Sequence, residues 1–340
     1  MISSDLKAMA PQILAAIRSA NNILLHLHPG PDEDSVGSAL AMYHVLQGMG
    51  KQATIIAGDS ELPEKWQVLP GYSLIKKVNF LQLPATDYDL FLIQDASTPM
   101  RISNLGAVNI PTAMRTVIID HHQTNLEFGD INLVLPHYPA TAQILYELFR
   151  EWGIGLTHDV AVCLMVGMNA DTGGFIYPLT TPDTFRAAAE LAEYAPDYSK
   201  YISAIYNSKS KAEIAFDGLA LNAVETICAG RVAMASVSYD QLQAKGISDA
   251  HVNAGHIAGT LRTVKEWLIG VCLVETAPGV VRVSFRTTHP DKYDVSKITG
   301  AFADGGGGHQ AAAAGTVRQP LAVAKQYVIN TMTNIYPELK

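Results

Sequence analysis

The stretch from Val117 to Asn125 constrains the fold of this 340-residue chain more than any other. Apolar, β-branched residues lead into an acid and two adjacent histidines, Asp120, His121 and His122. Such a run predicts a buried strand that ends abruptly in polar side chains. In open α/β sheets, ligands bind at the carboxyl ends of strands, where the loops converge. The triplet therefore indicates a metal or phosphate site, and a solvated loop is the alternative that it leaves open when taken alone.

A second segment of this kind lies nearer the N-terminus. A strand predicted from Asn22 to His28 is followed by a polar turn with Asp32 and Asp34, and then by a helix predicted from Ala39 to Met49. The two acids are expected to project to the same side of an extended turn, with His28 just upstream. Three such ligands close together suit a divalent ion. The alternative is that the acids only cap the following helix.

Two more acids follow predicted buried elements. The apolar run from Leu90 to Gln94 ends at Asp95, and a helix predicted from His158 to Met168 is stopped by glycines that leave Asp171 on an exposed turn. A lone acid in either place is usually a turn former or a helix cap. We predict a metal site because candidate ligands recur at the ends of several predicted elements.

Beyond about residue 195 the pattern changes. A connecting helix is predicted over residues 197–215, and an α+β module with its own core is predicted after it, with strands at 232–239, 267–274 and 280–287 and helices at 251–262 and 319–333. Its most conspicuous feature is the glycine run 305–308 before His309. The alanine-rich stretch that follows predicts a helix start, whose N–H groups favour an anion. A flexible turn is the alternative.

Composition and charge restrict the class of protein. Hydrophobic content of 48% and charged content of 16% describe an ordinary globular chain, long enough for about two domains. The net charge of −8 argues against binding of duplex DNA, which depends on phosphate neutralisation. Three cysteines without a Cys-x-x-Cys pair indicate buried thiols in a reducing compartment. No signal peptide or long apolar run is evident, so we expect a cytoplasmic protein without a membrane span.

Together these motifs resemble the DHH phosphoesterase superfamily, which is named for its Asp-His-His triplet. The resemblance covers nearly the whole chain and is closest to the small two-domain members of the nano-RNase and adenosine-bisphosphate phosphatase type. It implies an α/β N-terminal DHH domain with a mainly parallel sheet, a smaller α+β C-terminal domain and a cleft between them. We expect the DHH domain in residues 1–190, a helical linker in 191–218 and the substrate-binding domain in 219–340.

The resemblance also implies roles for the motif residues. Two divalent cations would be bound, Mn²⁺ in the first place, with Mg²⁺ as the alternative. One ion would be held by His28, Asp32 and Asp95, and the other, sharing Asp95, by Asp34, His121 and Asp171. Asp120 would fix a histidine tautomer, which is the usual role of a carboxylate behind a ligating imidazole, and His122 would face the substrate phosphate.

For the second domain, the resemblance implies contacts to the end of a nucleotide away from the cut. The implied contacts are Arg286, Gly306, Gly307, Gly308 and His309, with Arg262 as a further candidate. Arg282 shares a strand face with Arg286, and a solvated edge is the alternative for one or both.

The chain departs from the usual family pattern at Thr141-Ala142-Gln143, at Ala170 and at Ala314, where family members usually carry a Ser-Thr pair with an acid, a threonine and a glycine. Since Gly315 follows Ala314, the predicted helix start would be shifted by one residue. None of these positions is an implied metal ligand, so they bear on fine substrate preference only.

The expected activity is hydrolysis of phosphoric esters. Two divalent ions about 4 Å apart bring the pKa of a shared water toward 7, so that a hydroxide attacks phosphorus in line while His122 takes up charge. Such an enzyme would degrade very short oligonucleotides to mononucleotides, with dephosphorylation of adenosine 3′,5′-bisphosphate as a second activity to be tested. The alternatives are a cyclic or linear dinucleotide (c-di-AMP or pApA) phosphodiesterase, a pyrophosphatase or polyphosphatase, and a non-catalytic nucleotide-binding regulator. The oligomeric state is left open, with a homodimer as one alternative.

Overall fold

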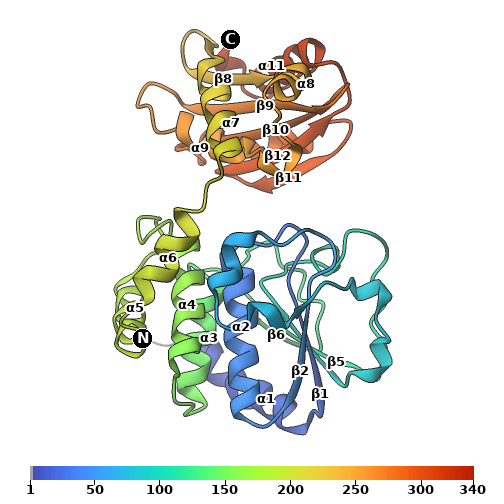
Figure 1. Cartoon of the computed structure of the whole chain (residues 1–340), viewed down its shortest axis with the longest axis vertical. Coiled ribbons are helices and arrows are strands. Elements are labelled where there is room, and N and C mark those ends of the chain that lie inside the picture. Colours follow the sequence, from blue (N-terminus) through green and yellow to red (C-terminus); the bar gives the residue numbers. More distant parts are fainter. Residues whose placement is uncertain (1–2) are drawn as a thin grey trace. The chain divides into compact units, whose positions relative to one another are not determined.

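The computed structural model describes residues 3–340 and divides the chain into two compact units between Ser208 and Lys209 (Figure 1). Each unit is built on one six-stranded sheet. The predicted fold class, an α/β unit with a parallel sheet followed by a smaller α+β unit, is confirmed. No helix in the described part of the chain is long and apolar enough to cross a membrane.

The sheet of the N-terminal unit is parallel throughout, with the strand order β3-β2-β1-β4-β5-β6. Its strands are β1 (Asn22–His26), β2 (Gln52–Ile56), β3 (Ile75–Lys76), β4 (Leu90–Gln94), β5 (Arg115–Asp120) and β6 (Ile131–Val134). Strand β1 pairs with β2 on one side and with β4 on the other, so the order of the strands reverses at β1. In open parallel sheets such a reversal opens a crevice at the carboxyl ends of the two neighbouring strands.

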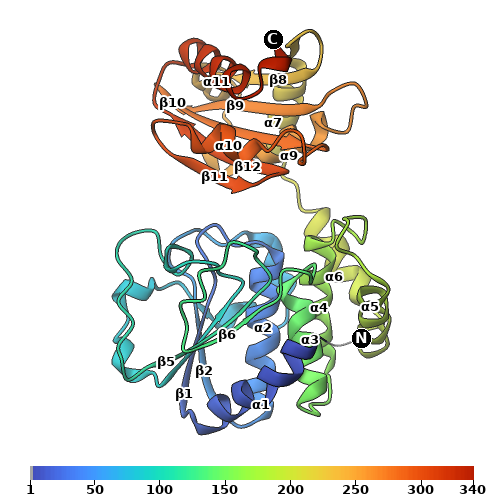
Figure 2. The ribbon, with the colours of Figure 1, turned by 180° about the vertical axis from the view of Figure 1, so that it is seen from behind.

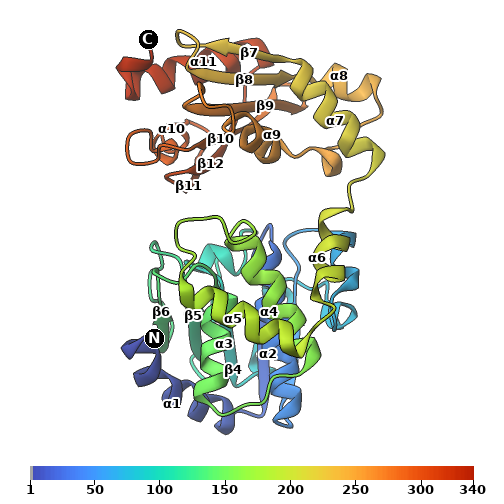
Figure 3. The same cartoon turned by 90° about the vertical axis from the view of Figure 1, so that its left-hand side faces the viewer.

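Helices cover one face of this sheet, and connecting segments cover the other. The helices are α1 (Ser4–Ser19), α2 (Glu33–Gly48), α3 (Thr141–Glu151), α4 (His158–Asp171), α5 (Pro182–Tyr194) and α6 (Tyr198–Tyr206) (Figure 3). The opposite face packs against apolar side chains of the connections, among them Phe80, Ile102 and Met114. With both faces covered, a strand such as β4 is buried along its whole length, which explains its continuous apolar sequence.

Two helix boundaries in this unit differ from the prediction. Helix α2 begins at Glu33 and not at Ala39, because the Asp32 side chain caps it by accepting from the Ser35 N–H at 3.0 Å. Asp34 therefore lies in the first helical turn, and the expectation that both acids project to one side of an extended turn is wrong. Helix α4 continues to Asp171, so the prediction of an exposed turn at Asp171 is also wrong; left-handed Gly173 ends the helix only after it.

The connection between the units is also different from the prediction. The single connecting helix expected over residues 197–215 is wrong, because α6 ends at Tyr206 and α7 (Lys211–Asn222) begins as a new helix. Ser210 starts α7 with a capping box: its hydroxyl accepts from the Glu213 N–H, and the Glu213 carboxylate accepts from the Ser210 N–H.

The C-terminal unit has a mixed sheet with the order β11-β12-β10-β9-β8-β7. Its strands are β7 (Val224–Ile227), β8 (Val232–Val237), β9 (Ile269–Ala277), β10 (Val280–Thr287), β11 (Gly306–His309) and β12 (Ala312–Val317), and only β8 and β9 pair in parallel. Helices α7 and α9 (Ala254–Leu261) pack on one face, with α8 (Tyr239–Ala244) beside them. Helices α10 (Val295–Gly300) and α11 (Leu321–Ile335) pack on the other, as Figure 2 shows.

The helix predicted after His309 is wrong. Residues Gly306–His309 and Ala312–Val317 form a hairpin, and β12 lies between β11 and β10. The hairpin packs closely on α10: a Cβ atom on Gly306 would come within 2.6 Å of the Thr299 carbonyl oxygen. The glycines thus allow close packing of a strand, and the anion site that a helix start would provide is not formed.

Several shorter elements were not predicted from the sequence. They include the strands β3, β6 and β7, the helices α8 and α10, and the 3₁₀ turns η1 (Glu64–Val68), η2 (Tyr72–Leu74), η3 (Phe80–Gln82), η4 (Ala85–Asp87), η5 (Pro99–Arg101), η6 (Asp249–His251) and η7 (Pro337–Leu339).

The crossing of α2 and α4 depends on a glycine. A Cβ atom on Gly37 would lie 2.5 Å from the Cys163 carbonyl oxygen, so Gly37→Ala should force the helices apart and lower the free energy of unfolding by about 1–3 kcal/mol. At Gly48, the last residue of the same helix, a Cβ atom would have nothing within 4 Å, so Gly48→Ala is the matched control and should be neutral or slightly stabilising. Urea denaturation of both variants measures the difference, and equal stability would contradict this packing.

Candidate metal centre

The six predicted metal ligands come together at the carboxyl ends of β1, β4 and β5. Two groups have ligand atoms that all lie within 4.8 Å of one another; they are His28, Asp32 and Asp95, and Asp34, His121 and Asp171. The residues reach this place from the end of β1, from the start of α2, from the ends of β4 and β5, and from the last residue of α4. Their convergence lies at the strand reversal described above.

Asp95 lies between the two groups. Its Oδ2 is 3.3 Å from His28 Nε2, and its Oδ1 is 3.6 Å from His121 Nε2. The residue directly follows β4 and has a left-handed backbone with φ of 54°, which is unfavourable for a residue with a side chain. Its N–H bonds to the Ile119 carbonyl on β5. Such local strain persists only where surrounding structure imposes it, and it is common at functional sites.

In the first group, His28 presents its Nε2 to the carboxylates. Its Nδ1 lies 3.1 Å from the Pro29 carbonyl, which accepts its hydrogen, while Nε2 is 3.7 Å from Asp32 Oδ2. Burial lowers the pKa of His28, but Asp32 and Asp95 more than offset this and raise it to about 10. The Arg101 guanidinium, with Nη2 3.1 Å from Nε2, opposes that protonation.

Asp32 serves two purposes at once. Its Oδ1 caps helix α2, as the structural alternative for this residue predicted, and its Oδ2 faces His28. The capping interpretation and the metal interpretation are therefore compatible, because they use different oxygens.

In the second group, Asp34 is completely buried at the N-terminus of helix α3. Its Oδ2 accepts from the Thr141 N–H at 2.7 Å, and its Oδ1 accepts from the Ala142 N–H at 2.9 Å. Burial and the neighbouring carboxylates, Asp95 foremost, raise the pKa of Asp34 well above its ordinary value. The two helix N–H groups work in the opposite direction, because they favour the charged form.

His121 and Asp171 complete the second group. The His121 Nδ1 lies 3.4 Å from the Tyr138 carbonyl, while its Nε2 is 3.2 Å from Asp171 Oδ2. Burial lowers the pKa of His121, but Asp171 and the other acids raise it to about 10, and burial raises the pKa of Asp171 to about 6. The Asp171 contact is an ion pair without hydrogen-bond geometry, so among the described residues His121 Nε2 is a buried nitrogen with no hydrogen-bond partner. An ion bound there would satisfy this nitrogen, so the donor set fits a divalent metal.

Asp120 and His122 form a separate pair behind the ligands. His122 Nδ1 is 2.7 Å from Asp120 Oδ1, so Asp120 fixes this ring and leaves Nε2 as the ring nitrogen turned away from it. The other Asp120 oxygen accepts from Asn125 Nδ2 at 2.6 Å. Burial alone would raise the pKa of Asp120, but these partners hold it below its usual range. A third group, Asp95 with both histidines, is a poorer metal site because His122 Nδ1 already serves Asp120.

The structure adds supporting residues that sequence reasoning missed. Asn125 lies in the predicted stretch but received no role, although it anchors Asp120. Ser38 approaches Asp34 Oδ1 at 3.4 Å, and Tyr138 orients His121 through a backbone carbonyl, which no side-chain motif could reveal. Arg101 on η5 had no sequence signal beyond its place six residues after Asp95.

In the C-terminal unit, strand register aligns two of the predicted substrate contacts. Ala312 pairs with Arg286 on one side and with His309 on the other, so the three side chains point to the same face of the sheet. Because neighbouring strands are about 4.8 Å apart, the Cα atoms of Arg286 and His309 are roughly 10 Å apart across this row. The Arg286 Nη1 donates to the Phe285 carbonyl, and Nη2 lies near Gly255 on α9.

The remaining predicted contacts differ in position. Gly307 is on the same face as His309, with nothing within 4 Å of a Cβ atom, whereas Gly306 and Gly308 pack closely against neighbouring backbone. Arg262 follows the C-terminal end of α9, whereas Arg286 contacts the first turn of that helix. Neither arginine lies on an edge strand, because β10 is inside the sheet. Arg282 is nevertheless solvent-exposed, as the solvated alternative predicted, and it pairs with Asp249.

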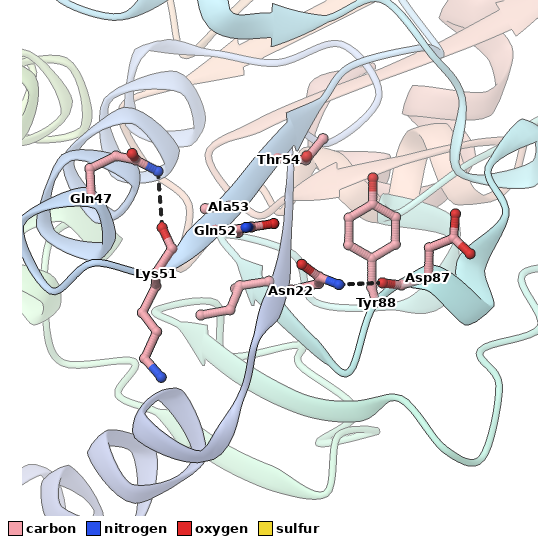
Figure 4. Close-up of a pocket in the computed structure, with 9 residues that line it drawn as sticks. Asn22, Gln47, Lys51, Gln52, Ala53, Thr54, Asp87 and Tyr88 are labelled. Carbon is pink, nitrogen blue, oxygen red and sulfur yellow. Dashed lines mark hydrogen bonds between the residues drawn. The ribbon is translucent and has the colours of Figure 1, made fainter.

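A pocket of about 410 Å³ lies at the opposite end of the N-terminal sheet (Figure 4). It is lined at the starts of β1 and β2 by polar side chains, among them Asn22, Gln52 and Tyr88. The positively charged residue of the lining, Lys51, is already bonded to the protein, because its Nζ donates to the Ala20 carbonyl at the end of α1. The pocket contains none of the predicted ligands and is not part of the candidate centre.

Comparison with known proteins agrees with the geometry. Residues 22–168 match the DHH family, N-terminal domain. The chain is 29% identical, over 91% of its length and 88% of the relative, to the bifunctional oligoribonuclease and PAP phosphatase NrnA of Thermus thermophilus. The Bacillus subtilis protein of the same name is 25% identical over 83% of the chain and 86% of the relative. A probable manganese-dependent inorganic pyrophosphatase of Bacillus cereus is 28% identical over 53% of the chain and 57% of the relative.

A solved structure shows the same fold. The exopolyphosphatase-related protein from Bacteroides fragilis superimposes with a TM-score of 0.89, at 20% identity and with 98% of each chain covered. The matched family domain contains the strand ends that carry His28, Asp95 and the Asp120-His121-His122 triplet. The chain is therefore similar to the DHH family over residues 22–168, which contain all of the predicted metal ligands except Asp171.

Proposed function

We propose that this chain is a metal-dependent phosphoester hydrolase that degrades very short oligonucleotides to mononucleotides. The observation that carries the proposal is the pair of ligand groups that share Asp95, one oxygen facing each group. Relatives named oligoribonuclease and PAP phosphatase match over more than four fifths of the chain, which supports a small nucleotide substrate. Dephosphorylation of adenosine 3′,5′-bisphosphate is proposed as a second activity on the same grounds.

Two divalent cations are the proposed cofactors. The donors are carboxylate oxygens and imidazole nitrogens, which suit Mn²⁺, and relatives named as manganese-dependent pyrophosphatases support that metal over Mg²⁺. His28, Asp32 and Asp95 would hold one ion, and Asp34, Asp95, His121 and Asp171 the other. When bound, such ions lower the pKa of water and neutralise charge on a phosphoryl group.

The protein's own groups orient these ligands and the substrate. The Pro29 and Tyr138 carbonyls fix the rings of His28 and His121 with Nε2 turned toward the acids. Asp120 accepts from His122 Nδ1 and holds the ring, so that Nε2 is the ring nitrogen proposed to contact a phosphoryl oxygen.

In the C-terminal unit, Arg286 and His309 are proposed to bind a part of the nucleotide that is not cut. Ala312 lies between them, and Gly307 and Ala314 form the next row. Because these residues carry at most a methyl group, this part of the sheet face is open to a ligand. Gly306 and Gly308 would act through the backbone of the hairpin, and Arg262 is kept as an additional phosphate contact.

The alternatives can be separated in one assay. The purified protein with Mn²⁺ would be given a dinucleotide, a longer RNA, adenosine 3′,5′-bisphosphate, cyclic di-AMP and pyrophosphate. We expect the dinucleotide and the bisphosphate to be cut fastest. Preference for cyclic di-AMP or pyrophosphate would replace the proposed substrate class, and a lack of all hydrolysis would favour a nucleotide-binding regulator.

Replacing Asp95 should abolish every activity in this assay. Asp95→Asn keeps a residue that tolerates the left-handed backbone but removes the charge shared by both groups, so kcat should fall by about a thousandfold or more. Asp87→Asn, at an exposed acid on η4, is the control and should leave kcat unchanged. Substantial turnover by Asp95→Asn with normal Mn²⁺ binding would rule out the shared-ligand assignment.

Metal binding should release protons and strengthen as pH rises. The pKa of His121 is raised to about 10, so its ring is protonated near neutral pH, and an ion can bind Nε2 only after that proton leaves. Between pH 6 and 8, the Mn²⁺ affinity should increase by up to about tenfold per pH unit for each proton released.

Calorimetric titration of the metal-free protein in buffers of different ionisation enthalpy measures the released protons directly. His121→Gln should release one proton fewer than the wild type, whereas His251→Gln, at a histidine that bonds to Ser248 in the C-terminal unit, should release as many. An affinity that does not change with pH would contradict ligation by His121.

The substrate role of the C-terminal unit can be tested apart from the metals. Arg286→Ala and His309→Ala should lower kcat/KM for dinucleotides by about one to three orders of magnitude, because remote binding energy positions the scissile phosphate. Hydrolysis of a small aryl phosphate ester should be nearly unaffected. Arg282→Ala is the matched control, since it lies on the same strand face but pairs with Asp249. Normal dinucleotide cleavage by His309→Ala would leave the glycine-rich hairpin without a substrate role.

A further inference from the structure

Arg101 lies in the metal centre although no motif pointed to it. The residue ends the short turn η5, which follows β4 and Asp95. Its guanidinium makes two contacts there: Nη2 is 3.1 Å from His28 Nε2, and Nη1 donates to the Pro29 carbonyl at 3.2 Å. Its own carbonyl accepts from Nε2 of the buried His26 at 3.2 Å, so the backbone under the side chain is fixed as well.

The contact with His28 involves the atom that an ion would use. The hydrogen on His28 Nδ1 goes to the Pro29 carbonyl, so Nε2 is the ring atom turned toward Asp95 and Asp32. A divalent ion bound by these three residues would approach Nε2 to about 2 Å. A guanidinium cannot stay within 3.1 Å of the same atom once an ion is bound to it, because both groups are cations and the ion occupies that position.

The negative charge of the surrounding carboxylates explains why the Arg101 guanidinium lies in this cluster. Five carboxylates gather in this small volume, from Asp32, Asp34, Asp95, Asp120 and Asp171. The guanidinium supplies positive charge beside Asp32 and Asp95, which would otherwise repel each other in a partly buried place. Arg101 is itself only partly buried, so its side chain has room to turn.

We propose that Arg101 competes with the metal ion for His28 and becomes a phosphate-binding residue once the ion is bound. The guanidinium leaves Nε2, keeps its bond to the Pro29 carbonyl, and turns Nη2 to an oxygen of the phosphoryl group that is being cut. The planar fork of arginine suits this change, because one nitrogen can hold the backbone while the other binds a phosphate oxygen. His26 is then a positioning residue for η5. The phosphate part of this inference rests on the proposed phosphoesterase function, whereas the competition with metal does not.

Arg101→Gln tests both parts. It removes the charge but keeps a polar side chain, so the metal-free protein should bind Mn²⁺ about three- to tenfold more tightly by calorimetry. The melting temperature should fall more without Mn²⁺ than with it, since only the metal-free cluster uses the guanidinium. At saturating Mn²⁺, kcat/KM for a dinucleotide should fall by about a hundredfold. Arg115→Gln, at an exposed arginine that begins β5, is the control and should change none of these values.

The outcomes separate this inference from a structural role and from failure of the proposed function. Weaker or unchanged Mn²⁺ binding by Arg101→Gln would show that the arginine only supports the loop and would overturn the competition. Normal kcat/KM at saturating Mn²⁺ would overturn the phosphate contact.

Should Arg101→Gln not fold, Arg101→Lys is the second variant for this test. It keeps the positive charge but lacks the planar fork of arginine, so kcat/KM should fall at least about tenfold. A wild-type kcat/KM would overturn the proposal. If the wild-type protein cuts no phosphoester, the proposed function fails, and the Mn²⁺ titration still decides the competition.

Discussion

Repulsion among carboxylates is the constraint on which the N-terminal unit depends. Acids brought together at the carboxyl ends of β1, β4 and β5 destabilise one another unless each has its own donors. Backbone N–H groups provide much of what is needed: helix α3 bonds Asp34 through its first N–H groups, α2 bonds Asp32 through Ser35, and the His121 N–H bonds Asp120. The first turns of α2 and α3 thus contribute to the site as well as to the core, and a divalent cation would relieve the repulsion that remains among the carboxylates.

This dependence on backbone explains which departures from the usual family pattern the site tolerates. Thr141 and Ala142 stand where family members usually carry a Ser-Thr pair, yet Asp34 is bonded by their N–H groups, which any residue other than proline supplies. The small Ala142 side chain has a packing role instead: a Cβ atom on Gly167 would lie 2.9 Å from Ala142 Cβ and 2.8 Å from Asp34 Oδ1. Only small residues on both helices leave Asp34 in place.

The candidate ligands could be proposed from the sequence, because His28, Asp95 and His121 follow apolar runs whose ends are visible in the pattern. The geometry could not. Asp32 and Asp34 fall in different candidate ligand groups, because helix α2 begins between them. The start of the helix is set by the Asp32 cap, which a hydrophobic pattern does not show. The residues that orient the ligands were missed for a similar reason. Tyr138 acts through a carbonyl, and Arg101 reaches His28 across 73 residues of sequence.

The C-terminal unit shows where local sequence preference fails to predict the structure. Alanine is the best helix former, yet Ala312–Val317 is a strand, because pairing with both β10 and β11 outweighs local preference. What sets the Arg286–His309 row is the register of this pairing: a slip of one residue would turn His309 to the face covered by α10 and α11. Close contacts at Gly306 and Gly308, where a side chain would strike the carbonyls of Thr299 and Ala312, fix that register. The glycine run thus acts less as a flexible loop than as the element that aligns a histidine with an arginine two strands away.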